Sequence, residues 1–138
     1  QVLKRAGVKV LFDQVKVQPG KPTTFGIHPG CVVFGLPGNP VSAFVQFETL
    51  VRPLIYKMMG HDWKPDIRNL PMAARFERRS ADRAAWIPVT ITASHEAMPC
   101  EYHGSAHITA FPYAQGLVSM DAGQNIIEKG EIVGVRQI

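Results

Sequence analysis

The stretch Gly35-Leu36-Pro37-Gly38-Asn39-Pro40 decides how the first part of this chain folds. The apolar run before it, Cys31 to Phe34, predicts a buried strand, and the residues from Pro40 to about Met59 predict a long helix. Asn39 suits the N-cap of that helix and Pro40 its first position. A loop of this kind aims backbone N–H groups outward, which suits a phosphate or another oxyanion, although a purely structural turn is the commoner case.

The predicted helix has its apolar residues at helical spacing, which leaves Gln46, Arg52 and Lys57 for a wetter side. Pro53 lies inside it and is expected to kink it, because proline lacks an N–H and crowds the carbonyl four residues earlier. Gly60 is expected to close the helix.

Upstream of the loop, a second candidate motif is the turn Gln18-Pro19-Gly20-Lys21-Pro22. Residues 8–17, rich in β-branched side chains, predict one or two strands broken near Asp13, and residues 23–27 predict another strand. The turn between them would present Lys21, a compact cation suited to an oxyanion, although most turn lysines are simply solvated. The chain opens as if with the last turns of a helix that nothing caps, so we expect it to be a piece of a longer protein.

Beyond residue 62 the helical period ends and short strands separated by Gly, Pro, Asn and Asp begin; they are predicted at 70–76, 85–93, 117–120 and 131–135. This spacing is typical of a small all-β barrel or sandwich. The sequence therefore predicts two domains, the end of an α/β domain at 1–62 and a compact β domain at 63–138.

Composition excludes several function classes. The chain has 46% apolar and 19% charged residues, and no run approaches the roughly 20 apolar residues of a membrane span. Its two cysteines match no metal spacing, which makes the cytosol the expected compartment.

The positive charge is concentrated in the first part of the chain. Residues 1–62 hold seven Lys/Arg against three Asp/Glu, whereas residues 63–138 hold eight of each. Without a dense basic run, we expect a small anionic ligand and no nucleic acid.

A third candidate motif is Gly104-Ser105-Ala106-His107, whose hydroxyl and imidazole could hydrogen-bond a ligand. Alone it is weak, because a Ser–His pair without a third partner is no triad. The sequence shows no paired carboxylates and no His/Cys metal cluster. We therefore expect no metal ligand in this chain and no nucleophile or general base.

Taken together, these motifs resemble the C-terminal third of the molybdopterin molybdenumtransferase family, the bacterial MoeA and gephyrin E-domain type. The resemblance rests on the 17–26 segment VQPGKPTTFG, the 35–43 segment GLPGNPVSA, Gly104 to His107 and the 114–117 segment AQGL, in order along nearly the whole chain. It implies that 1–62 is the C-terminal part of a molybdopterin-binding three-layer α/β domain, and 63–138 a C-terminal β-barrel domain.

The resemblance also implies an activity, a ligand set and site residues. Family members are homodimers that use magnesium and adenylated molybdopterin, and insert molybdate with release of AMP. The magnesium ligands would lie upstream of this chain, and the chain alone would be inactive. On this carry-over Pro37 and Pro40 match prolines tied to activity, Ser105 matches a serine facing the cleft, and Gln14 and Gln18 occupy ligand-binding positions. Together with the turn and loop chemistry above, the expected catalytic residues are Pro37, Pro40 and Lys21, and the expected ligand-binding residues are Gln14, Gln18, Lys21, Gly35, Gly38, Asn39, Ser42 and Ser105.

This chain departs from the family pattern at a few positions. Many members have lysines where Gln14 and Gln18 stand here, and an arginine where the segment Trp86-Ile87-Pro88 has proline. Lys16 and Lys21 could supply the missing charge near the glutamines, and Arg83 near Pro88. Two alternatives therefore stay open: a paralogue that kept the fold and lost the chemistry, and a gephyrin-like scaffold or binding module. Molybdate and tungstate have nearly the same size and charge, so the sequence does not distinguish them.

Overall fold

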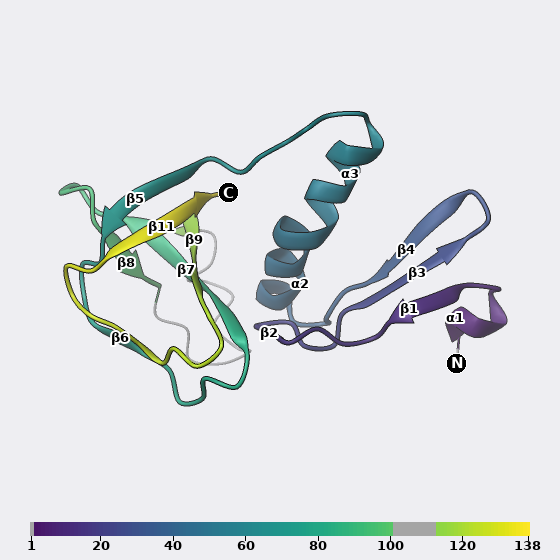
Figure 1. Ribbon diagram of the computed structural model, residues 1–138, viewed down its shortest axis with the longest axis horizontal. Helices are drawn as coiled ribbons and strands as arrows, with labels where there is room; N and C mark the ends of the chain where they lie inside the picture. The colour runs from purple at the N-terminus through teal and green to yellow at the C-terminus, as the bar shows by residue number, and fades with distance from the viewer. Residues whose placement is uncertain (1, 101–112) are drawn as a thin grey trace. The chain divides into compact units, whose positions relative to one another are not determined.

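The computed structural model describes residues 2–100 and 113–138 of the chain, which divides into two compact units, 1–61 and 62–138 (Figure 1). No helix in these described ranges is long and apolar enough to cross a membrane. Each unit is described in turn below.

The first unit opens with the short helix α1 (Val2–Arg5), followed by strands β1 (Lys9–Phe12), β2 (Val17–Gln18), β3 (Thr24–His28) and β4 (Cys31–Gly35). Strands β1, β3 and β4 form an antiparallel sheet in that order. Gly7 ends α1 with a φ of 73°, and Gly30 turns the β3–β4 hairpin with a φ of 82°. Both angles favour glycine, because its lack of a Cβ removes the steric penalty at positive φ.

A single helical rod follows β4, built from α2 (Pro40–Gln46), a π-helical turn (Phe47–Val51) and α3 (Arg52–Met58). The kink expected at Pro53 stays a prediction. A π-helical turn comes just before this proline, and in it the N–H of Arg52 donates to the carbonyl of Phe47, five residues back. The wider turn ends where Pro53, without an N–H, cannot continue the regular ladder. Gly60 closes the helix, as expected, with a φ of 81°.

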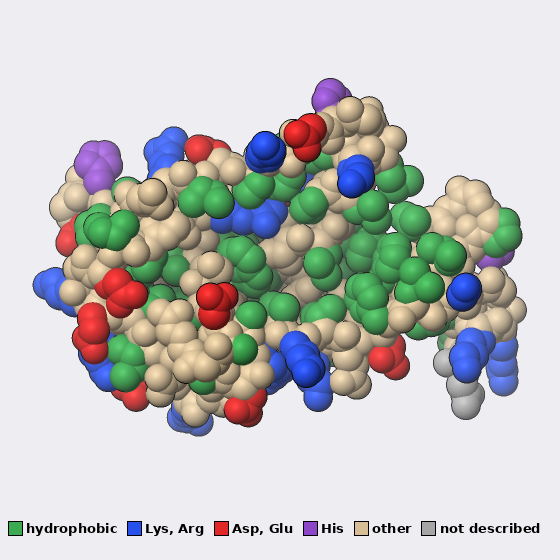
Figure 2. All heavy atoms as spheres, in the orientation of Figure 1, with side chains coloured by type: hydrophobic (Ala, Val, Ile, Leu, Met, Phe, Trp, Pro, Cys, Tyr) green, Lys and Arg blue, Asp and Glu red, His purple; other side chains and the backbone are tan. Residues whose placement is uncertain are grey.

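The buried character predicted for Cys31 to Phe34 is wrong. Cys31 is exposed and Val32 is 38% exposed, because β4 is an edge strand of the three-stranded sheet. One face of this sheet carries an aromatic row in which the ring of Phe25 lies 5.6 Å from that of Phe12 and 4.8 Å from that of Phe34. Figure 2 shows hydrophobic side chains gathered over β1, β3 and β4. The apolar sequence of residues 31–34 therefore predicted the strand correctly, but it did not predict how exposed the strand is.

The second unit is built of strands β5 (Ile67–Pro71), β6 (Phe76–Glu77), β7 (Ala84–Ile91), β8 (Ala97–Pro99), β9 (Gly116–Met120), β10 (Ile126–Ile127) and β11 (Ile132–Gln137). Four of them form an antiparallel sheet in the order β7-β9-β11-β5, β8 also pairs with β7, and β6 pairs with β10. Alternate residues of β7 are buried and join a core that includes Met72, Met120, Ile127 and Val135.

The predicted barrel is not confirmed. Within residues 62–100 and 113–138 the strands form the sheet and the two-stranded ladder just described, and no closed barrel is found. Strands β8 and β10 were not predicted, because they are too short to show a period of their own.

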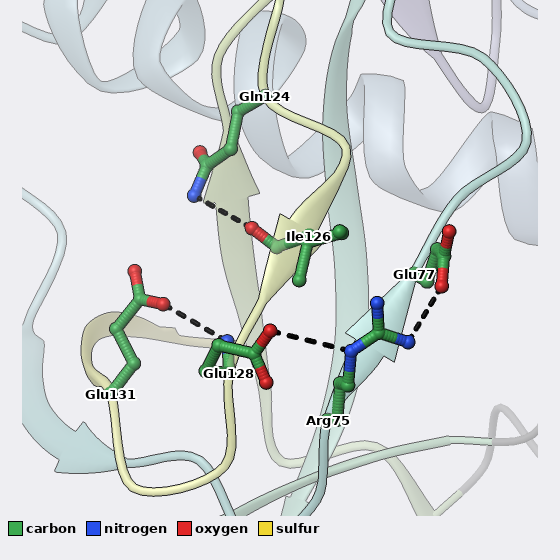
Figure 3. Close-up of polar contacts among 6 residues, drawn as sticks. All are labelled: Arg75, Glu77, Gln124, Ile126, Glu128 and Glu131. Carbon is green, nitrogen blue, oxygen red and sulfur yellow. Dashed lines mark hydrogen bonds and ion pairs between the residues drawn. The ribbon is translucent and has the colours of Figure 1, made fainter.

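Two arginines hold the β6 region in contrasting ways. Arg78 is buried, and its guanidinium donates to the carbonyl oxygens of Gln124 (2.7 Å), Arg83 (2.6 Å) and Asp121 (2.7 Å). Arg75 is exposed and forms ion pairs with the carboxylates of Glu77 (2.6 Å) and Glu128 (3.4 Å), as Figure 3 shows. Arg78 therefore links two loops through buried hydrogen bonds, whereas Arg75 takes part in a solvent-exposed network of ion pairs.

Candidate functional site

The two candidate motifs of the first unit lie at the same end of the β3–β4 hairpin. Thr24, the first residue of β3, pairs with Gly35, the last residue of β4, while His28 and Cys31 pair at the opposite end. The turn at 18–22 leads directly into β3, and the loop at 36–39 leads directly out of β4. The antiparallel register therefore brings the Lys21 turn and the Gly-Pro-rich loop together, although they are separate in the sequence.

The backbone of the Lys21 turn is closed on itself by hydrogen bonds. The carbonyl oxygen of Lys21 accepts from the N–H groups of Val15 and Thr23, both at 2.9 Å. The buried hydroxyl of Thr23 donates to the carbonyl oxygen of Gly20 at 2.7 Å. Gly20 has a φ of 111°, a conformation that side chains rarely adopt. These bonds turn residues 15–23 into a closed loop with a defined backbone.

The closed loop and the residue before it carry three of the predicted ligand-binding side chains. Lys21, Gln14 and Gln18 are all exposed. The N–H of Val15, the residue after Gln14, donates to the carbonyl oxygen of Lys21. Residues 13–21 contain Lys16 and Lys21 against one acidic residue, Asp13. The loop therefore offers two amide side chains and a net positive charge, a set suited to an anion.

The loop after β4 ends in the predicted helix cap. The side-chain oxygen of Asn39 accepts from the N–H of Ser42 at 3.2 Å, and the backbone of Asn39 is extended, with φ −74° and ψ 123°. Pro40 occupies the first helical turn. This geometry confirms Asn39 as the N-cap, and it commits the predicted ligand residue Asn39 to a structural bond.

The glycines and prolines of the 35–40 loop have different surroundings. Gly35 is tightly placed, since an added Cβ would lie 3.2 Å from the Cβ of Thr24. Gly38 is exposed and has no positive φ, and among the described residues an added Cβ there would meet nothing within 4 Å. Pro37 is buried and Pro40 exposed. Pro37 can therefore shape the loop, whereas Gly38 presents bare backbone to whatever approaches it.

A residue that the sequence pattern assigned to the wet side of the helix connects the helix to the turn. Gln46 is 1% exposed, and its Nε2 donates to the carbonyl oxygen of Pro19 at 2.8 Å. The predicted exposure of Gln46 is therefore wrong. Its partner lies 27 residues away, a separation that helical periodicity does not register. A polar residue beside the apolar stripe was the only signal available.

Two further predicted ligand-binding residues are Ser105 and Ser42. Ser105, with the whole Gly104 to His107 motif, lies outside the described residues. Ser42 is buried in α2. Within the described part of the chain, no group of three or more His, Cys, Asp or Glu side chains could hold a metal ion.

Two family descriptions match this chain, one in each unit. Residues 1–57 match a family described as a probable molybdopterin binding domain, and residues 69–138 match the MoeA C-terminal region, domain IV. Curated relatives named molybdopterin molybdenumtransferase come from Staphylococcus epidermidis and Haemophilus influenzae. They are 28% and 30% identical to the chain over 98% and 97% of its length. The chain spans about a third of the length of these relatives, 33% and 34%.

Solved structures agree with these matches. A molybdopterin biosynthesis MoeA protein from Pyrococcus horikoshii superposes on 93% of this chain and 32% of its own, with a TM-score of 0.81 and 31% identity. A molybdenum cofactor biosynthesis protein from Pyrococcus furiosus has a TM-score of 0.82 at 20% identity, over 95% of this chain and 46% of its own. At that identity the second likeness shows the fold alone.

Proposed function

Because this chain belongs to the MoeA family of molybdopterin molybdenumtransferases, we propose that it is part of an enzyme that inserts molybdate into adenylated molybdopterin with release of AMP. Molybdenum cofactor biosynthesis is the process that the family relationship supports. The insertion step, a homodimeric assembly and a cytosolic location are further parts of this proposal. We also propose that the chain alone does not catalyse this reaction, since it spans about a third of its relatives' length.

One observation carries the proposal, namely the convergence of the two motifs at the open end of the β3–β4 hairpin. The pairing of Thr24 with Gly35 puts the start of β3 and the end of β4 at the same end of the hairpin, which supports a shared site for the exposed Lys21 turn and the 35–40 loop. Adenylated molybdopterin and molybdate are both anionic, so gathering them requires positive charge and hydrogen-bond donors. The side chains of Lys21, Gln14 and Gln18 supply both.

Gly38 gives independent support. A glycine is usually required by a positive φ or by a close neighbour within the protein; Gly38 has no positive φ, and none of the described residues lies close to it. A ligand that passes against the backbone of the loop would supply the missing reason. In this role Gly38 would let a phosphate or oxyanion approach the loop more closely than any side chain would permit.

The chemistry expected of these residues is binding and orientation. Lys21 would neutralise part of the negative charge that accumulates when two anions meet, and the amide groups of Gln14 and Gln18 would donate to ligand oxygens. Pro37 and Pro40 would hold the loop in the shape that the ligand requires. Magnesium is expected in the family. The described residues do not form a site for it, so none of these roles passes through the ion.

The test is molybdate-dependent release of AMP from adenylated molybdopterin by the full-length protein. We expect release with the wild type and a strong decrease in a Pro37→Ala/Pro40→Ala double variant whose melting temperature stays close to that of the wild type. Absence of molybdate-dependent release from folded wild type would favour the paralogue or scaffold alternative. A proline variant that keeps full specific activity would reduce the loop to a structural turn.

A further inference from the structure

We propose that Gln46 is a positioning residue of the ligand site, which fixes the Lys21 turn against the helix that starts at the 35–40 loop. The inference rests on the proposed function of that site. Its basis is the hydrogen bond of 2.8 Å from Nε2 of Gln46 to the carbonyl oxygen of Pro19, two residues before Lys21. Through this bond, the helix that begins beside one motif holds the backbone of the other.

The contact between Gln46 and the turn is close as well as polar. A Cβ on Gly20 would lie 2.5 Å from Cγ and 2.6 Å from Nε2 of Gln46, so the amide side chain lies directly against the backbone of the turn. The carbonyl oxygens of Pro19, Gly20 and Lys21 each accept a hydrogen bond, from Gln46, Thr23 and the Val15 and Thr23 amides respectively. Gln46 is the member of this set that reaches the turn from the helix.

An amide side chain at position 46 lowers the folding free energy gained there, because it buries an unpaired oxygen. This cost suggests that the amide is needed for its directed hydrogen bond. Oε1 of Gln46 is buried and has no hydrogen-bond partner among the described residues. A methionine would fill nearly the same volume without burying an unpaired oxygen. Only the amide, however, donates a directed bond to Pro19. Gln46 thus contributes orientation of the turn, at some expense of folding free energy.

Gln46 does not itself contact a ligand in this proposal. It is fully buried, whereas Lys21 is exposed, so any effect of Gln46 on a ligand must act through the turn. This order of action distinguishes a positioning residue from a general stabiliser. Loss of Gln46 should matter only while Lys21 is present to be positioned.

A double-mutant cycle in the full-length protein tests that dependence. Gln46→Met, Lys21→Ala and the double variant are assayed for molybdate-dependent AMP release, with kcat and KM for adenylated molybdopterin measured separately. We expect Gln46→Met to lower kcat/KM about 5–20-fold, mainly through KM, and to change it less than about twofold in the Lys21→Ala background. An equal loss in both backgrounds would overturn the proposal.

The matched control is Thr49→Val on the same helix. The hydroxyl of Thr49 donates to the carbonyl oxygen of Val45 at 2.7 Å, within the helix. This variant also removes one partly buried side-chain hydrogen bond, and we expect it to leave kcat/KM within about twofold of the wild type. A loss equal to that of Gln46→Met would make Gln46 a general stabiliser and overturn the proposal.

Hydrogen exchange in the 138-residue chain separates this inference from the proposed function. The amides of Val15 and Thr23 both donate to Lys21, so they report on the turn without any substrate. We expect both to exchange at least about tenfold faster in Gln46→Met than in Thr49→Val. Unchanged exchange overturns the anchoring by Gln46. A Lys21→Ala enzyme with wild-type activity contradicts the proposed function instead, while faster exchange would still support the anchoring.

Discussion

Thr24 lies directly opposite Gly35 in the antiparallel register of β3 and β4. This pairing decides where the two motifs of the first unit meet, because one precedes Thr24 and the other follows Gly35. An added Cβ on Gly35 would lie only 3.2 Å from the Cβ of Thr24. The glycine therefore permits the close pairing from which both the turn and the loop leave the sheet.

The cap at Asn39 should be worth a measurable amount of stability. Asn39→Ala removes the acceptor for the Ser42 N–H, and we expect a loss of about 0.5–2 kcal/mol in the free energy of unfolding, measured with urea. Asn39→Asp keeps an acceptor at the same place and serves as the control. Equal losses in the two variants would show that the cap bond is not what Asn39 contributes.

Gly38 and Gly20 should respond in opposite ways to alanine. Gly38→Ala meets open space and no positive φ, so stability should stay constant or rise by up to about 1 kcal/mol, while AMP release by the full-length protein falls. Gly20→Ala combines a φ of 111° with a clash against Gln46, and should cost about 1–3 kcal/mol from backbone strain alone. Gly38→Ala with full activity would remove the ligand explanation for Gly38.

Arg78 and Arg75 provide a matched test of burial. Arg78→Met leaves the carbonyls of Gln124, Arg83 and Asp121 without their donor and should cost at least about 3 kcal/mol. Arg75→Met removes only the exposed ion pairs of Figure 3, and we expect an unfolding midpoint indistinguishable from the wild type. If the two variants unfolded at the same urea concentration, the buried hydrogen bonds of Arg78 would not stabilise the fold more than the exposed ion pairs of Arg75.

The two cysteines should differ in reactivity. Cys31 is exposed, whereas Cys100 is partly buried, and burial raises the pKa of the Cys100 thiol. A raised pKa lowers the thiolate fraction at any pH below it, and the thiolate is the reactive form. Iodoacetamide at about pH 8 should therefore label Cys31 before Cys100, as followed by peptide mass spectrometry. Preferential labelling of Cys100 in folded protein would contradict the structure there.

Local signals predicted much of the first unit. The strands around Gly20 and Gly35, the cap at Asn39 and the helix end at Gly60 follow from turn and capping chemistry within a few residues of each position. The kink expected at Pro53 is not tested, and the π turn at Phe47–Val51 was not predicted. The resemblance to the family rested on these same local motifs.

Long-range relations could not be predicted from the sequence. The burial of Gln46 depends on Pro19, 27 residues away, and the exposure of Cys31 depends on the position of β4 at the edge of its sheet. In the second unit, alternation identified β7 but gave no information on how strands pair. The expected barrel was therefore an inference from spacing and resemblance, and the described strands do not confirm it.

The role of Lys21 can be measured against Lys9, an exposed lysine on the sheet of the same unit. Lys9 is exposed on β1 and pairs with Ile27, near the opposite end of the β3–β4 hairpin from the site. In the full-length protein, Lys21→Ala should lower kcat/KM for molybdate-dependent AMP release by about 10–100-fold, as expected for a lost charge-assisted hydrogen bond. Lys9→Ala should stay within about twofold, with both melting temperatures unchanged. Equal activity of the two folded variants would contradict a ligand site at this end of the hairpin.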